Sequence, residues 1–313
     1  MRARSVLLYH PEEADAYARL VKAPRGAILL HSCATPEEAS FVIEEAEILY
    51  AWNFPAELLA RAGRLRWIQV MGAGAERFLV PELPRSAVIT RAAGVFGPWM
   101  AEYTLAWCAW VTQRMEQFRE AQRHHRWAAA RPDRLRGQTL AVVGLGDIGR
   151  EIGRLAHAFG MRVVGVSRSG RKPRGADAVY RPSGLTRAVA GCDFTVVTLP
   201  LTADTRGLIG ERELRAMKPS AWLLNLGRGP VVQERALLRA LEEGWIAGAI
   251  LDVFDTEPLP ADHPFWGREN VVVTPHIAGP SVPEEIAPIF NENLRRYLAG
   301  KRPRYVVDRS RGY

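Results

Sequence analysis

Three side chains suited to acid–base and anion chemistry each follow an apolar run in the second half of the chain. Arg228 follows residues 222–226, Glu257 follows 250–254, and His276 follows 271–274. An arginine can hold a carboxylate in a bidentate fork, a histidine can release a proton near neutral pH, and a neighbouring glutamate would orient that histidine. Each residue alone is commonplace at a strand end. Together, at the edge of a parallel sheet where ligands bind, they predict proton transfer to an anionic substrate.

A second motif predicts a dinucleotide site. The β-branched run 139–143 reads as a buried strand, and Gly144, Gly146 and Gly149 follow at G-x-G-x-x-G spacing before an amphipathic helix at 148–159. The first glycine allows the tight turn, the second lets a pyrophosphate approach the backbone, and the third lets the helix pack on the strand. The helix N-terminus, with Asp147 and Ile148, offers free N–H groups to the phosphates. A plain structural turn is the alternative.

Alternating strands and helices predict the elements that position these residues. An α/β unit with expected strands at 5–9, 27–31, 48–52, 67–71 and 87–90 ends near residue 98, and Thr35, Pro36 and Glu38 form a capping-box pattern for one of its helices. One long helix is expected at 99–127. A second unit starts at 139, and a last helix at 283–298 is expected to return to the first domain. The expected divisions are residues 1–98, 99–282 and 283–313.

Composition excludes several other classes of protein. The 313 residues are 48% hydrophobic and 24% charged, and no apolar run reaches the ~20 residues of a membrane span. The start has no signal-type cleavage site, so we expect a cytoplasmic protein without a membrane partner. Cys33, Cys108 and Cys192 lack metal-type spacing, so no metal site or disulfide is expected. The net charge of +8 is spread along the chain. Its densest part, 295–313, predicts a solvated surface rather than a nucleic-acid site.

The chain resembles the D-isomer-specific 2-hydroxyacid dehydrogenases in its glycine motif and in segments 225–229, 251–258 and 274–279. The resemblance implies two doubly wound parallel-sheet α/β domains, a Rossmann dinucleotide-binding domain inserted in a flavodoxin-like substrate domain. It implies that Arg228 orients the substrate, that His276 is the general acid with Glu257 as its partner, and that Asp252 binds the nicotinamide carboxamide. The remaining implied cofactor contacts are Leu199, Pro200, Leu226, Gly227, His276 and Gly279.

The same resemblance implies a substrate pocket in the first domain. The loop Met71, Gly72, Ala73 and Gly74 would offer N–H groups to the substrate carboxylate, and Trp52 would line the pocket. A glycine turn and a core tryptophan are the alternatives. One departure is visible, because Glu76 stands where the family usually has aspartate.

The end of the second strand of the dinucleotide fold predicts which nicotinamide is used. An enzyme specific for NAD usually has an acid there, which binds the ribose 2′-hydroxyl. This chain has Ser167, Arg168 and Ser169, followed by Arg171 and two more cations. These residues predict NADP(H), preferred over NAD(H), with a solvated basic loop as the alternative.

We therefore expect an oxidoreductase that passes hydride from NADPH to a small 2-oxo acid and gives the D-2-hydroxy acid. Segments 96–103 and 307–313 resemble the glyoxylate/hydroxypyruvate reductase branch. A different or bulkier 2-oxo acid is one alternative, and a nucleotide-sensing, corepressor-like binding protein is another. The tryptophans at 99, 107 and 110 suit either an interdomain core helix or a dimer contact, and a homodimer is expected.

Overall fold

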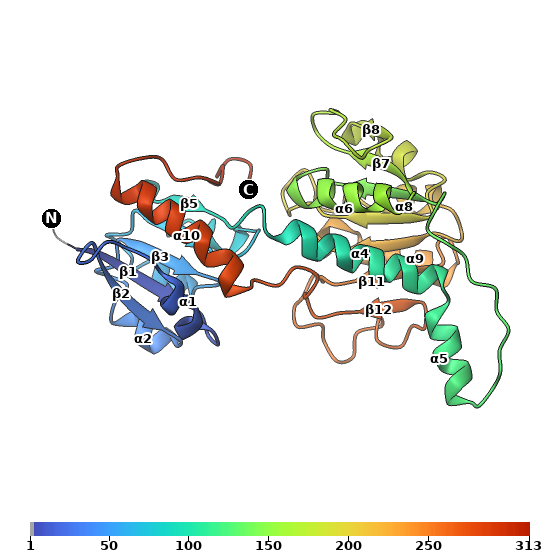
Figure 1. Cartoon of the computed structure of the whole chain (residues 1–313), viewed down its shortest axis with the longest axis horizontal. Coiled ribbons are helices and arrows are strands. Elements are labelled where there is room, and N and C mark those ends of the chain that lie inside the picture. Colours follow the sequence, from blue (N-terminus) through green and yellow to red (C-terminus); the bar gives the residue numbers. More distant parts are fainter. Residues whose placement is uncertain (1–2) are drawn as a thin grey trace. The chain divides into compact units, whose positions relative to one another are not determined.

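The computed structural model describes residues 3–313, which form two compact units (Figure 1). Unit 1 comprises the described residues up to Val95 together with Ser281–Tyr313, and unit 2 is Phe96–Pro280. The boundaries expected from the sequence, after residues 98 and 282, lie three and two residues further along the chain than these.

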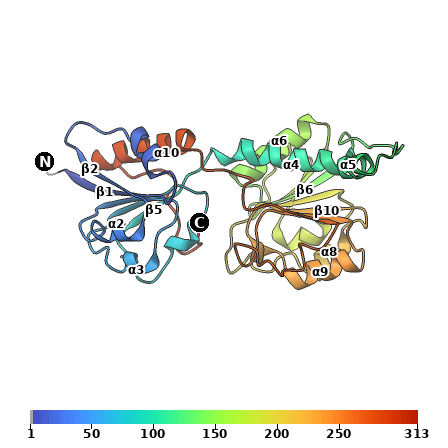
Figure 2. The same ribbon diagram turned by 90° about the horizontal axis from the view of Figure 1, so that it is seen from below.

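Unit 1 is built on a five-stranded parallel sheet with the strand order β2-β1-β3-β4-β5. This is the flavodoxin-like order of a doubly wound sheet. Figure 2 shows α10 over one face of the sheet and α2 and α3 over the other. Strands β3 and β4 are buried at every position, as expected where helices cover both faces. The elements are β1 (Arg4–Tyr9), α1 (Ala14–Leu20), β2 (Ile28–Cys33), α2 (Pro36–Ser40), β3 (Ile48–Ala51), α3 (Ala56–Leu59), β4 (Trp67–Val70), the 3-10 helix η1 (Glu76–Phe78), β5 (Val88–Thr90) and α10 (Pro283–Leu298).

Two local features show how unit 1 is held together. The predicted capping box of α2 is confirmed, since Glu38 N donates to Thr35 Oγ1 at 3.2 Å and the Glu38 carboxylate accepts from Thr35 N. The ring of Phe290 on α10 stacks on Tyr50 of β3 at 4.1 Å and on Trp67 of β4 at 5.4 Å between centroids. Stacked, buried aromatic rings thus fix the last helix on the sheet.

Unit 2 is built on a seven-stranded parallel sheet with the order β12-β11-β10-β9-β6-β7-β8. The order reverses between β6 and β9, which is the switch point of a Rossmann sheet. Both sheets confirm the predicted fold class. Figure 2 shows α4 and α6 on one face and α8 and α9 on the other. The elements are α4 (Phe96–Thr112), α5 (Met115–Arg123), β6 (Thr139–Val143), α6 (Asp147–Ala158), β7 (Arg162–Val166), β8 (Ala178–Tyr180), η2 (Pro182–Gly184), α7 (Leu185–Val189), β9 (Phe194–Val197), α8 (Glu211–Ala216), β10 (Trp222–Asn225), η3 (Gly229–Val231), α9 (Glu234–Glu242), β11 (Gly248–Leu251) and β12 (Val271–Val273).

The prediction of one helix over 99–127 is wrong. Helix α4 begins three residues earlier, at Phe96, and ends at Thr112, and Arg114 then adopts a left-handed conformation with φ 52°. Helix α5 ends at Arg123, where His125 is left-handed and Arg126 N donates to Ala121 O at 2.8 Å. This is a Schellman ending, usually formed by glycine. Arginine stands at the first break and histidine at the second, so the residue types did not indicate either of them.

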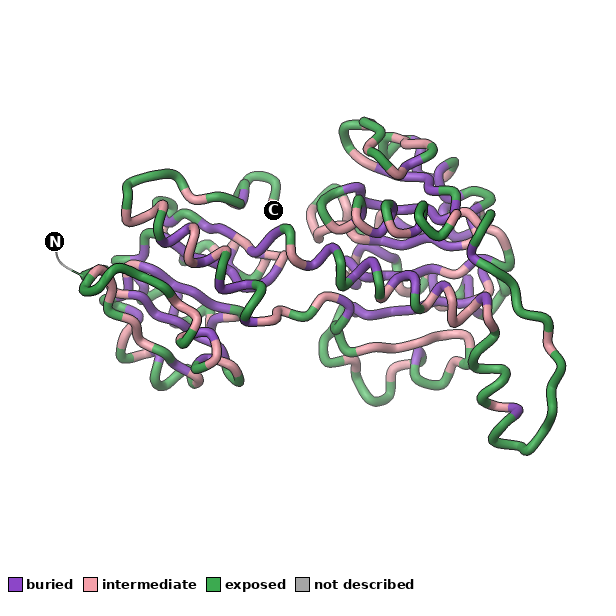
Figure 3. The backbone as a smooth tube through the Cα atoms, viewed as in Figure 1, coloured by how far each residue is buried: buried purple, intermediate pink, exposed green. Residues whose placement is uncertain are grey.

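Burial follows the two sheets, as Figure 3 shows. The chain after α5 is exposed from residue 124 to 129. Cys33, Cys108 and Cys192 are buried free thiols. Across residues 3–313, every helix is too short or too polar to span a lipid bilayer.

Candidate active site

The glycine motif forms a cradle at the end of β6. Gly144 has φ 114°, which a side chain would resist, and a Cβ at Gly149 would lie 2.0 Å from Gly144 O. A Cβ at Gly146, by contrast, would meet no atom within 4 Å. The first and third glycines therefore shape the turn and its packing, and the second leaves the backbone open to a close approach. This geometry fits a dinucleotide pyrophosphate.

The start of α6 supports the same fit. Gly146 is the N-cap residue of α6, and it makes no side-chain cap to the N–H groups of the first turn, which begins with Asp147 and Ile148. A helix of 12 residues presents the positive end of its dipole there. A phosphate would accept hydrogen bonds from these groups.

The predicted 2′-phosphate residues lie in a turn after β7. Ser167 Oγ and Ser169 Oγ are 3.5 Å apart, and Arg171 N donates to Ser169 Oγ at 3.2 Å. Ser167 N also donates to Tyr180 O at 3.0 Å, which joins the ends of β7 and β8. The two hydroxyls and the exposed Arg171 are thus gathered at one corner of the sheet.

The structure adds Arg181 to this corner, a residue that the sequence analysis missed. Its Cγ and Nε lie 3.1 and 3.4 Å from the place that a Cβ of Gly170 would take. Within residues 3–313, neither Arg171 nor Arg181 forms an ion pair with a carboxylate. Arg181 directly follows β8, the strand paired with β7. Its place at this corner therefore depends on the pairing of the two strands.

His276 and Glu257 form the predicted acid–base pair. Their Nδ1 and Oε2 atoms are 2.9 Å apart, and the side chains are 43% and 28% exposed. Glu257 Oε1 also accepts a hydrogen bond from Phe254 N at 3.0 Å. Burial by itself raises the pKa of Glu257, but the hydrogen bonds from His276 and Phe254 and the charges of His276 and Arg228 hold that pKa below its ordinary value. Glu257 is therefore a carboxylate that orients the imidazole.

Arg228 lies in a turn that Asn225 holds. Asn225 is 2% exposed, and its amide group donates to Arg228 O at 3.1 Å and accepts from Gly227 N at 3.3 Å. Arg228 itself is half-buried, and its Nη1 donates to Gly227 O at 2.7 Å. Sequence analysis missed this use of Asn225, because an asparagine inside a buried strand shows its partners only in the fold.

The turns that carry Arg228 and Glu257 touch through backbone atoms. A Cβ at Gly229 would lie 2.0 Å from the carbonyl carbon of Phe254. Only glycine allows this approach, so the position of one turn fixes the other.

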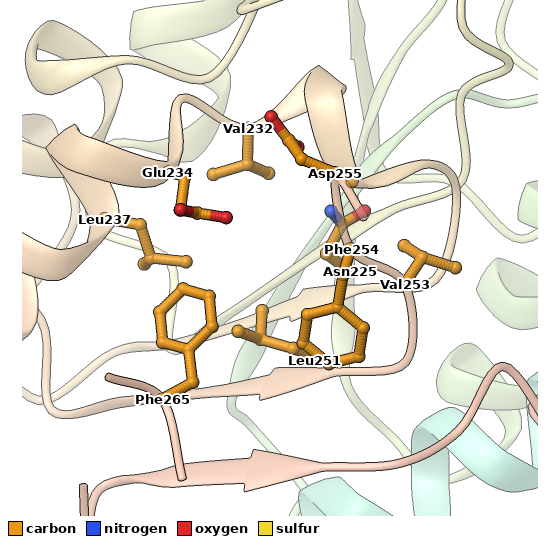
Figure 4. A pocket seen from close by; sticks show the side chains of 10 residues that line it. Asn225, Val232, Glu234, Leu237, Leu251, Val253, Phe254, Asp255 and Phe265 are labelled. Atoms are coloured by element: carbon orange, nitrogen blue, oxygen red, sulfur yellow. The ribbon is translucent and has the colours of Figure 1, made fainter. Parts of the chain in front are cut away.

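A small pocket lies beside both turns. It is lined by Asn225, Gly229, Phe254 and Phe265 and by residues of β11 and α9. Figure 4 shows Asp255 at one end of the pocket and Phe265 at the other. Burial and the negative charge of Glu234, a second carboxylate of the lining, raise the pKa of Asp255.

Asp252 is buried inside the loop that carries His276. It is 1% exposed, and its two carboxylate oxygens accept hydrogen bonds from Ile277 N and Ala278 N, both at 2.9 Å. His276 itself has a left-handed φ of 55°. Asp252 therefore supports the backbone around His276, a role that the sequence did not indicate, and its contact with the nicotinamide stays a prediction.

Other predicted cofactor residues lie at neighbouring strand ends. A Cβ at Gly227 would lie 2.6 Å from Leu199 O, so the segments after β9 and β10 are in contact, and Pro200 and Leu226 flank that contact in the chain. Gly279 packs on α4, where a Cβ would be 3.2 Å from Met100 Cγ. Their contacts with a dinucleotide stay predictions.

The predicted substrate residues meet one another in unit 1. A Cβ at Gly72 would lie 3.1 Å from Cζ3 of the Trp52 ring, and Trp52 is 39% exposed rather than a core tryptophan. Met71 is fully buried, and its carbonyl accepts from Ser281 Oγ at 3.3 Å. Glu76, two residues after Gly74, begins the short helix η1. Trp52 and the loop 71–74 thus form one surface of unit 1.

Comparison with known protein families decides the family. The model described as "D-isomer specific 2-hydroxyacid dehydrogenase, NAD binding domain" matches residues 105–278. The chain belongs to the D-isomer specific 2-hydroxyacid dehydrogenase family. Family membership supports a nicotinamide dinucleotide as the cofactor and reduction of a 2-oxo acid as the reaction, as the sequence predicted.

Individual relatives are similar over most of their length. A glyoxylate/hydroxypyruvate reductase A of Serratia proteamaculans is 33% identical over 278 residues, 86% of this dehydrogenase and 88% of the relative. A glyoxylate reductase of Aeropyrum pernix is 36% identical over 282 residues, covering 85% and 84%. The crystal structure of an NADPH-dependent glyoxylate/hydroxypyruvate reductase from Sinorhizobium meliloti, in complex with NADP and sulfate, matches with a TM-score of 0.91 and 27% identity, covering 99% of this chain and all of that one.

Proposed function

We propose that this dehydrogenase reduces glyoxylate or hydroxypyruvate with NADPH to the D-2-hydroxy acid. Unit 2 is the proposed dinucleotide-binding domain and unit 1 the proposed substrate domain. The observation that carries the proposal is the 2.9 Å contact between His276 and Glu257, with Arg228 on the neighbouring turn. The names of the relatives from Serratia and Aeropyrum support the choice of small 2-oxo acids.

The proposed roles follow from the chemistry of the three side chains. A bound nicotinamide dinucleotide supplies the hydride. Glu257 holds Nδ1 of His276, which leaves Nε2 to give a proton to the carbonyl oxygen of the substrate. Arg228 has five N–H donors in a fixed fork, which suit a carboxylate and the neighbouring carbonyl. The proposed partners in unit 1 are the N–H groups of the loop 71–74 and the side chain of Trp52.

The preference for NADPH rests on the corner formed by β7 and β8. Ser167, Arg168, Ser169 and Arg171 would hold the 2′-phosphate, and Arg181 adds a cation that the structure places beside the same turn. No carboxylate follows β7 that would bind a ribose 2′-hydroxyl. The NADP complex of the Sinorhizobium relative supports this preference.

One set of kinetic measurements tests the reaction. Purified protein is given NADPH or NADH with glyoxylate, hydroxypyruvate, pyruvate or an aromatic 2-oxo acid, and nicotinamide absorbance is followed. We expect fast oxidation of NADPH with the first two substrates, and at least about tenfold lower kcat/KM with NADH. Equal kcat/KM values for the two nucleotides would refute the NADPH preference. If the protein binds nucleotide but turns over none of these substrates, the result would favour a different substrate or the nucleotide-sensing, corepressor-like alternative.

Substitution of the proposed acid tests the catalytic assignment. His276→Gln should lose turnover and keep its affinity for 2′,5′-ADP, because the adenine half of the dinucleotide does not meet the imidazole. His157→Gln, which alters an exposed histidine on α6, is the matched control. Near-normal turnover of His276→Gln would exclude His276 as the general acid.

We also propose that the dehydrogenase is a homodimer. Large apolar side chains are exposed on α5 and in the segment after it, with Met115 44%, Phe118 36% and Trp127 fully exposed. Exposed apolar surface of this kind marks interaction sites. Light scattering should give twice the chain mass of 34.8 kDa, and Phe118→Glu should shift it towards the monomer.

A further inference from the structure

A chain of hydrogen bonds runs from helix α4 to the segment that carries His276. The hydroxyl oxygens of Tyr103, on α4, and Thr274, after β12, are 2.6 Å apart. Thr274 Oγ1 in turn donates to Asp252 Oδ1 at 2.7 Å. Because Thr274 has a single hydroxyl proton and gives it to the carboxylate, Tyr103 is the donor in the contact between the two hydroxyls.

The last member of this chain fixes the backbone beside His276. Asp252 accepts from Ile277 N and Ala278 N, the two amides that follow the left-handed His276. A non-glycine residue keeps that conformation only where the surrounding contacts hold it. The hydrogen bonds that Asp252 accepts therefore hold the backbone that aims the imidazole at Glu257. Thr274 is the third donor to this carboxylate, on the oxygen Oδ1 that also accepts from Ile277 N.

The surroundings of Tyr103 suit a permanent donor. Its side chain is half-buried on α4, with its ring 6.1 Å from that of Trp107. Burial raises the pKa of Tyr103, the hydrogen bond with Thr274 opposes this, and the charge of Asp252 raises it further. The phenol therefore keeps its proton at neutral pH.

We propose that Tyr103 and Thr274 are positioning residues for the acid catalyst. Tyr103 holds Thr274, Thr274 holds one rotamer of Asp252, and Asp252 holds the backbone of His276 so that its ring meets Glu257. The inference rests on the proposed role of His276 and extends the site to helix α4, for which the sequence predicted either an interdomain core helix or a dimer contact.

The pH dependence of reduction reports on this arrangement. The charged groups around His276 are Glu257, which contacts its ring, Arg228, which acts on the Glu257 carboxylate, and Asp252, which holds the following amides. Tyr103 stands behind Asp252 as a neutral donor. When the segment loosens, the contact between His276 and Glu257 lengthens, and the imidazole no longer keeps one orientation towards the substrate. The pH profile of reduction should then differ from that of the wild type.

The test uses Tyr103→Phe and Thr274→Val, each of which removes one hydroxyl with little change of shape. We expect roughly tenfold lower kcat, because about 1 Å of misplacement can cost up to about 100-fold. The pH profile of kcat should differ from that of the wild type, and the amides of Ile277 and Ala278 should exchange hydrogen faster. Binding of 2′,5′-ADP should stay within about twofold, which shows that unit 2 is folded.

Two variants serve as controls. Thr274→Ser keeps the hydroxyl and should restore kcat, the pH profile and slow amide exchange. Thr104→Val removes the neighbouring hydroxyl of α4, which donates to Met100 O at 2.7 Å, and should leave all three measurements unchanged.

The outcomes separate this inference from the proposed function. If His276→Gln is inactive while Tyr103→Phe and Thr274→Val match the wild type in all three measurements, the positioning role is refuted and the general acid stands. If Thr274→Ser is as impaired as Thr274→Val, the hydroxyl is not the cause and the inference also fails. If His276→Gln remains active, His276 is not the general acid, and the inference that rests on that role fails with it.

Discussion

Gly229 gives the sharpest test of how the turns that carry Arg228 and Glu257 are held in register. A Cβ at this position would lie 2.0 Å from the carbonyl carbon of Phe254, 2.3 Å from its oxygen and 2.4 Å from Asp255 N. Since Cβ atoms essentially never come within 3.0 Å of such neighbours, Gly229→Ala must push the turns apart by about 1 Å. That displacement falls on the segments that carry Arg228 and Glu257.

The cost can be divided between activity and stability. A misplacement of about 1 Å can reduce kcat/KM by about 100-fold, or about 2.7 kcal/mol of transition-state stabilisation. Overpacking of a buried site costs about 1–3 kcal/mol, and for a domain of this size each kcal/mol lowers Tm by about 2–4 °C. We therefore expect a folded variant with Tm lowered by up to about 10 °C and with little activity.

Steady-state kinetics with NADPH and glyoxylate, together with thermal unfolding, make the measurement. Gly267→Ala is the matched control, because its Cβ would meet no atom within 4 Å and, like Gly229, it has no left-handed φ. A Gly229→Ala variant with a lowered Tm and near-normal kcat/KM would refute the reasoning, since the turns would then tolerate the displacement without moving their side chains.

Three further predictions follow from single contacts. Glu257→Gln should lower kcat in steady-state kinetics, because His276 loses the carboxylate that orients its ring. Because the folded pKa of Glu257 is lowered, the stability that this carboxylate contributes is complete above the ordinary carboxyl pKa and is lost as pH falls through the lowered value. Unfolding of wild type and variant at about pH 3 to 6 would show that loss. Gly146→Ala should keep the wild-type Tm and weaken NADPH binding at least about tenfold, measured by calorimetry, because its Cβ points into open space. Phe290→Ala should cost about 3–5 kcal/mol in denaturant unfolding, since its ring is fully buried between Tyr50 and Trp67; a loss below about 1 kcal/mol would contradict this.

Several features could be predicted because they are local in the sequence. The strand, glycine turn and helix from Thr139 to Ala158 form from neighbouring residues, and the structure differs from the prediction only in that α6 starts and ends one residue earlier, at Asp147 and Ala158. The capping box of α2 depends on Thr35 and Glu38 alone. The contact of His276 with Glu257 was predictable because parallel strands end at one edge of a sheet.

Other features depend on contacts between segments that are distant in the chain. Arg181 joins the β7 corner because β8 pairs with β7, and Tyr103 reaches Thr274 across 171 residues. The helical stretch is broken at Arg114 and His125, which adopt a left-handed conformation that non-glycine residues rarely take. The residue types at these positions therefore did not predict the breaks.

The sequence by itself determined the two parallel sheets, the glycine cradle after β6 and the pairing of His276 with Glu257. Periodicity, glycine spacing and strand ends are properties of neighbouring residues, and they need no knowledge of the packing. Only the tertiary structure decided that Asp252 is buried beneath His276, that Asn225 holds the Arg228 turn and that Gly229 locks this turn to Phe254. Hydrogen bonds and close backbone contacts of this kind depend on distances of a few tenths of an ångström between remote segments, and only the folded chain sets those distances.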